Sequence, residues 1–255
     1  GHLSVEDFAT QALRFDLAMN TINVDDYLPK PVATAPAPIE TDPKVAAHTA
    51  EDKIALPVEL LRSLNIDGHL RIDELTASKL LFEKANVSLK AKDGKISIDP
   101  LTAEAYGGQA TINASMNVQG KQPTYRLKAD MHGVQSGDVF AALLGDRIVS
   151  GAATLGTNLS TAGDSITQIK QSLNGSLQTK FAEGTIKGSK LSAKIIEARN
   201  FVRKLEGKSL LENKVTDSTR FSVLTATADV KAGVLTNDDL SLLAPLFHAT
   251  GAGTV

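Results

Sequence analysis

Apolar and polar residues alternate one by one over long stretches of this chain, and this pattern constrains the fold more than any other feature of the sequence. In QATINASMNVQG, residues 109–120, the apolar positions are Ala110, Ile112, Ala114, Met116 and Val118. In TYRLKADM, residues 124–131, they are Tyr125, Leu127, Ala129 and Met131. A period of two is typical of a strand with one dry face and one solvated face. The sequence therefore predicts a mainly β protein with a largely antiparallel sheet and few helices.

A tight turn and an internal repeat support this prediction. Asp93-Gly94 separates NVSLKA from ISI, and Asp-Gly favours a two-residue hairpin turn, in which both residues need positive φ. The segment 92–111, KDGKISIDPLTAEAYGGQAT, can be set over 231–250, KAGVLTNDDLSLLAPLFHAT. Asp99 then matches Asp238, whose neighbour is a second acid, Asp239. A hairpin unit that recurs in this way indicates a repetitive sheet, with Asp238 as a polar break between strand segments.

The remaining segments predict four helices, a linker and a division of the chain. We expect helices from Pro57, from Ser136 with Ser136 as cap and Gly145 as stop, between Asp164 and Gly175, and over 189–206. The last is basic and amphipathic, so it packs on the sheet or lies on an anionic membrane or a partner.

Residues 29–53, rich in proline and alanine, are expected to be a linker between the end of a preceding β segment at 1–28 and a β domain at 54–255. We expect that domain to be truncated at its C-terminus, as a piece of a longer protein.

Composition and spacing argue against several classes of function. The formal net charge is -2 and Trp is absent, which disfavours binding to nucleic acid. Cysteine is absent and the five histidines show no metal-ligand spacing, so no metal or cofactor is predicted. The acid pairs Asp25-Asp26 and Asp238-Asp239 are adjacent in sequence, and adjacent side chains of a strand point to opposite faces. We therefore predict no catalytic residues and no enzyme.

The apolar side of the predicted strands needs a cover, and the predicted helices are few and short. The sheet can close on itself as a sandwich or barrel, or it can remain an open, curled trough whose dry floor holds an apolar guest. Periodicity alone does not choose between these two. In the trough, the lipid-contacting residues are predicted to be Val87, Leu89, Ile112, Ala114, Met116, Val118, Leu127 and Met131.

Four segments of the chain, in order, resemble the AsmA family of Gram-negative envelope proteins. They are TINVDDYLPKP, the run from LPVELLRSLNIDGHLRIDELTASKL to AEAYGG, SLNGSLQTKFAEGTIKGSKL, and GVLTNDDLSLLAPLFHATGAGTV. The resemblance corresponds to the C-terminal periplasmic region of the family. It implies a protein anchored in the inner membrane by an N-terminal helix, and a curled sheet with an apolar inner surface like that of bridge-type lipid carriers. The family offers no catalytic residues to carry over.

These observations lead to a functional hypothesis and an alternative. The hypothesis is a periplasmic lipid-binding or lipid-transfer module that contacts phospholipid acyl chains and supports phospholipid transport to the outer membrane. Other envelope proteins are possible partners. The alternative is a non-enzymatic scaffold for outer-membrane protein assembly that acts through protein contacts at its edge strands.

Overall fold

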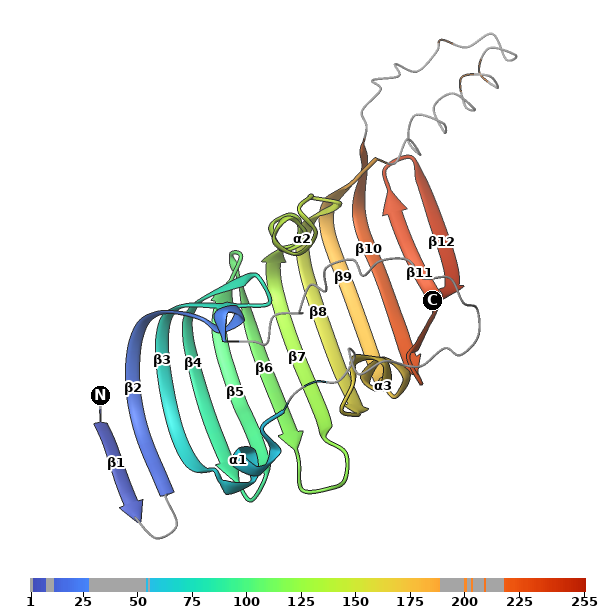
Figure 1. The fold of residues 1–255 in the computed structure, drawn as a ribbon. Coiled ribbons are helices and arrows are strands. Elements are labelled where there is room, and N and C mark those ends of the chain that lie inside the picture. Colours follow the sequence, from blue (N-terminus) through green and yellow to red (C-terminus); the bar gives the residue numbers. More distant parts are fainter. Residues whose placement is uncertain are drawn as a thin grey trace, which may run out of the picture.

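The computed structural model describes residues 2–7, 12–27, 54, 56–188, 200, 203, 209 and 218–255. These residues form one mainly β structure with short helices, as the alternation predicts (Figure 1). The strands are β1 (His2–Asp7), β2 (Ala12–Asn23), β3 (Asn65–Ala77), β4 (Leu80–Lys92), β5 (Lys95–Ala105), β6 (Gly108–Asn117), β7 (Thr124–Gln135), β8 (Val149–Ala162), β9 (Asn174–Lys187), β10 (Ser218–Lys231), β11 (Val234–Ala244) and β12 (Phe247–Thr254). The helices are the 3-10 turn η1 (Val24–Asp26), α1 (Val58–Ser63), α2 (Ser136–Leu144) and α3 (Ile166–Gln171).

All twelve strands belong to a single open sheet, and their order in space is their order in the sequence. Neighbouring strands are antiparallel except for β2 and β3, which run parallel from the pair Ala12 and Asn65 onward. Residues 28–53, which include the whole of the predicted linker at 29–53, lie outside the described residues. β1 and β2 nevertheless pair into the same sheet as the other described strands. An open sheet replaces the closed sandwich or barrel that the sequence left as an alternative.

Two-residue turns set the register of the hairpins. The predicted turn at Asp93-Gly94 is confirmed, with φ values of 50° and 74° and with Lys92 facing Lys95. Ala232-Gly233 repeats these values at 50° and 80°, at the equivalent place in the predicted repeat. Positive φ at both central residues is the backbone that matches the twist of the flanking strands. Each such turn fixes which residues of the next strand share a face with those of the previous one.

A bulge of the sheet explains why Asp239 stands within a strand. The register of β10 and β11 shifts between Thr225 and Asp229, next to Asp238-Asp239, so the predicted polar break is confirmed as a bulge. There the Asp239 carboxylate accepts from Thr227 N at 2.7 Å and from Thr227 Oγ1 at 2.8 Å. The backbone hydrogen bond from Thr227 is the main cause of a lowered pKa for Asp239. This acid is structural: it satisfies a backbone donor that the bulge leaves unpaired.

Three of the four predicted helices are present. α2 ends at Gly145 in the left-handed region, and Ser165 caps α3 by accepting from Gln168 N at 3.2 Å. Ser136, however, does not cap α2: it is the first helical residue, and its hydroxyl donates to Gly151 O at 2.9 Å, which ties the helix to β8. The predicted helix over 189–206 falls almost entirely outside the described residues.

The buried core lies on one face of the sheet, near the end that η1 and α2 cover. Ile72, Leu75, Phe82, Ala105 and Val134 belong to it, and Val139 of α2 packs against it. The opposite end of the same face is covered by α1 and α3 (Figure 1). Arg62 of α1 donates through Nε to Val118 O at 2.9 Å, and Thr161 of β8 donates to Ile169 O of α3 at 2.6 Å. The helices therefore lie at the two ends of the apolar face, and within the described residues no helix lies over its middle.

Candidate functional site: the apolar floor

The apolar face of β4–β8 consists of four rows of residues that run across the strands. Cross-strand partners share a face, so the register of the strand pairs assigns each residue to a row. We call these rows together the apolar floor. Each row is written in strand order: the first row begins on β5 and the other three begin on β4. From the α2 end to the α1 end, the rows are Ala103-Ala110-Met131-Leu155, Val87-Leu101-Ile112-Ala129-Thr157, Leu89-Ile98-Ala114-Leu127-Leu159, and Ala91-Ile96-Met116-Tyr125-Thr161.

The third row, which we call the accessible row, is the one row of the floor in which no residue is buried. Every residue in it is half-buried or exposed, and Leu127 keeps 37% of its surface accessible. The first row, by contrast, has Ala103, Ala110 and Met131 buried beneath the α2 end. Five adjacent strands span roughly 19 Å at a strand spacing near 4.8 Å. The accessible row is therefore a continuous aliphatic strip across the sheet, between the helices at its two ends.

The sequence prediction placed eight residues on this surface, and the structure puts all eight on the same face. Seven lie in the four rows, and Val118 follows β6 directly, with its N–H bonded to Gly94 O at 2.8 Å. Their accessibility differs, however. Val87, Val118 and Met131 are buried, with Val118 at 1%, whereas Leu89, Ile112, Ala114, Met116 and Leu127 are half-buried or exposed. The five accessible residues are the ones that a ligand on the floor could reach.

Sequence reasoning missed Ile98 and Leu159, which complete the accessible row. For Ile98 a signal was available, because the two-residue turn at Asp93-Gly94 sets Lys92 against Lys95 and hence Leu89 against Ile98. For Leu159 the signal was weak. On β8, Thr157 and Thr161 occupy floor positions between the apolar residues, so the sequence of this strand does not alternate cleanly between apolar and polar. Alternation therefore does not show which face of β8 is the apolar one.

Ionisable groups are almost absent from the floor. Tyr125 is the one titratable residue in the four rows. Its hydroxyl is buried and has no hydrogen-bond partner among the described residues. Burial raises the pKa of Tyr125, and the charge of nearby Asp164 raises it further. A neutral phenol at neutral pH keeps this end of the floor uncharged.

The described part of the chain offers little to metal or acid–base chemistry. Within it, no group of three or more His, Asp or Glu side chains could hold a metal ion. His69 and His132 are exposed on the opposite, polar face, and His248 Nε2 lies 2.9 Å from the Ser241 hydroxyl. The apolar floor, by contrast, presents mainly aliphatic side chains and no charged group.

Comparison with known proteins identifies the family of this chain. The AsmA family model matches residues 4–240, which is nearly the whole chain. The chain belongs to the AsmA family. Family membership implies a role in the cell envelope and in outer-membrane biogenesis, and the family is generally non-catalytic. Searches of curated proteins and of solved structures found no significant match. In the part of this AsmA-family chain that the structure describes, no helix has the length and hydropathy to cross a membrane.

Proposed function

We propose that the apolar floor binds phospholipid acyl chains, and that this AsmA-family chain is a periplasmic lipid-binding or lipid-transfer module of an inner-membrane-anchored protein. In this role it supports phospholipid transport to the outer membrane. The observation that carries the proposal is the accessible row Leu89-Ile98-Ala114-Leu127-Leu159, a strip of aliphatic side chains left partly open on an open sheet. Soluble domains rarely leave a continuous apolar strip exposed unless something binds there.

The energetics favour a hydrocarbon ligand. Moving one methylene from water to an apolar surface gains about 0.8 kcal/mol, so a chain that shields even half of its length gains several kcal/mol. The floor offers no charged side chain that would have to be desolvated. A headgroup can remain in water while the acyl chain lies along the row.

The proposal can be tested by photo-crosslinking in the periplasm of Gram-negative cells. A benzophenone amino acid replaces Leu127 on the floor or, as the matched control, Leu81 on the polar side of β4. The two leucines have similar exposures, 37% and 41%, so they differ chiefly in the face that they occupy. Phospholipid adducts are expected at Leu127 and not at Leu81. Equal labelling at both positions, or none at Leu127, contradicts lipid binding on the floor.

A second candidate function rests on the edge of the sheet. β12, FHATGAGT, is paired with β11 on one side and with no described strand on the other. It contains no Pro, Lys, Arg, Asp or Glu, the residues that usually protect an edge strand from pairing. A partner protein could add a strand there, as the scaffold alternative requires. Capture of a strand-forming partner by the wild-type chain, abolished by Thr250→Pro, would favour this function, whereas lipid adducts at Leu127 would be unaffected by that change.

A further inference from the structure

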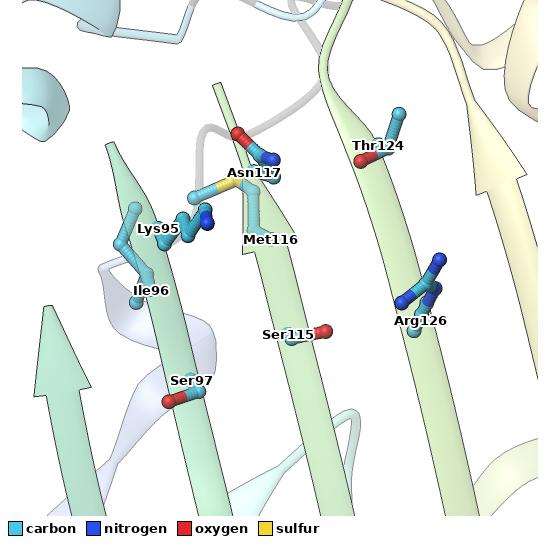
Figure 2. Close-up of a pocket in the computed structure, with 8 residues that line it drawn as sticks. All are labelled: Lys95, Ile96, Ser97, Ser115, Met116, Asn117, Thr124 and Arg126. Carbon is cyan, nitrogen blue, oxygen red and sulfur yellow. The ribbon is translucent and has the colours of Figure 1, made fainter. Parts of the chain in front are cut away.

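The polar face of the sheet contains a shallow depression of about 390 Å3, on the side of the sheet opposite the apolar floor. It lies over β5, β6 and β7, and Figure 2 shows the eight residues that line it. Six of them lie at the alternate strand positions that face the polar side. They form two rows across the strands, Lys95-Asn117-Thr124 and Ser97-Ser115-Arg126. The other two, Ile96 and Met116, lie between these residues along the strands and belong to the last row of the apolar floor.

The arrangement of these six residues creates both the hollow and its charge. The middle strand contributes Ser115 and Asn117, which are shorter than the two cationic side chains at opposite corners, Lys95 and Arg126. Two strand spacings and two residues along a strand separate the corner Cα atoms by about 12 Å. Two long side chains at this separation can both reach a small group that sits over the centre.

The electrostatic surroundings are positive. No carboxylate lines the depression, and neither Lys95 nor Arg126 forms an ion pair with a described residue. Lys90, Lys92 and Lys128, all exposed, flank it on β4 and β7.

The acids of the neighbourhood are partly engaged elsewhere. Asp99 accepts from the Asn113 amide at 2.6 Å, and Asp130 lies 4.0 Å from Lys128 Nζ. Asp67 faces Lys90 across the ladder, and Asp93 is in the turn next to Lys92. The cations over the depression therefore outnumber the acids that approach it.

Hydroxyl and amide donors flanked by an ammonium and a guanidinium suit a tetrahedral oxyanion. Arginine supplies a planar fork of N–H donors, lysine supplies a point charge, and charge-assisted hydrogen bonds to phosphate are among the stronger ones in proteins. Ser97, Ser115, Asn117 and Thr124 add neutral donors between them. We propose that this depression binds a phosphate group, which a lipid headgroup at a bilayer surface or a soluble phosphate ester can supply. It lies on the other face from the floor, so it does not depend on acyl-chain binding.

The test compares two double variants that remove the same charge. In Lys95→Gln/Arg126→Gln the two corner cations are lost. The matched control, Lys180→Gln/Arg220→Gln, removes two exposed cations from the polar face of the sheet, one on β9 and one on β10. Binding is measured by co-sedimentation with phosphatidylcholine vesicles that contain phosphatidylglycerol. Binding of soluble glycerol 3-phosphate is followed through the NMR amide signals of Ser97 and Ser115.

For a lipid source we expect the first variant to lose vesicle affinity by roughly thirtyfold, which corresponds to about 1 kcal/mol for each cation, and the control to stay within about twofold. For a soluble source, glycerol 3-phosphate shifts the Ser97 and Ser115 signals of the wild type but not of Lys95→Gln/Arg126→Gln, and vesicles do not bind. The proposal is overturned if neither probe binds, or if both double variants weaken binding equally. Lipid adducts at Leu127 are a separate readout, so either proposal can fail alone.

Discussion

Identical Leu→Asp substitutions at two depths of the same apolar face give the sharpest test of an open floor. Leu75 is 5% exposed and packs in the core near η1 and α2, whereas Leu127 is 37% exposed in the accessible row. Leu75→Asp removes about 2–3 kcal/mol of apolar burial and also places a carboxylate among apolar residues. The total, several kcal/mol, is a large part of the stability of a typical domain.

Leu127→Asp has a different expected cost. About a third of the side chain is already in contact with water, so the lost burial is roughly 1–2 kcal/mol, and the new carboxylate can stay hydrated. Urea denaturation at pH 7.5, followed by far-UV circular dichroism, measures both variants against the wild type. We expect Leu127→Asp to remain folded with a modestly lower midpoint, and Leu75→Asp to unfold at low urea or to fail to fold.

A third variant, Leu81→Asp, controls for the substitution itself, because Leu81 is 41% exposed on the polar face. It should lower the midpoint by about as much as Leu127→Asp, because a similar fraction of the side chain is buried and the new carboxylate can stay hydrated. The reasoning is refuted if Leu127→Asp destabilises the chain as much as Leu75→Asp does, since the accessible row would then be covered in solution and closed to a ligand.

Two further predictions concern the sheet. Because the pKa of Asp239 is lowered in the folded state by its bonds to Thr227, its stabilising effect is present above the unfolded pKa near 4 and is lost as pH falls below it. Asp239→Asn should therefore flatten the decline in urea midpoint between about pH 5 and pH 3, and a decline as steep as that of the wild type would contradict this role. A Cβ on Gly68 would lie 2.3 Å from the Phe15 ring, so Gly68→Ala should destabilise the chain by about 1–3 kcal/mol. In a double-mutant cycle, Phe15→Ala should relieve part of that loss, and simple additivity would show that the ring is not the obstacle.

Much of the fold could be predicted locally. The alternation in 109–120 and 124–131 fixed which side chains share a face, because the side-chain period of a strand is two. The Asp93-Gly94 turn added the register of its hairpin, and Gly145 marked the end of α2. Each of these depends on a few neighbouring residues, which is why sequence alone was sufficient.

The candidate site was only half predictable. All eight predicted floor residues lie on the apolar face, yet Val118 is buried and Leu127 is exposed, although both fit the same alternation. Alternation reports the face of the sheet and not what lies above it. Whether a floor residue is covered depends on where α1, α2 and α3 pack, which involves residues far away in the sequence.

The sequence by itself determined that this chain forms strands with one dry face, where the hairpins turn, and that no catalytic constellation is evident in its motifs. The tertiary structure alone decided that the sheet stays open, that β2 joins β3 in parallel, and that Lys95 and Arg126 stand at opposite corners of one depression. These features arise from pairing between segments separated by many residues. The free energy that selects such pairings comes from long-range packing, which no local pattern of residues encodes.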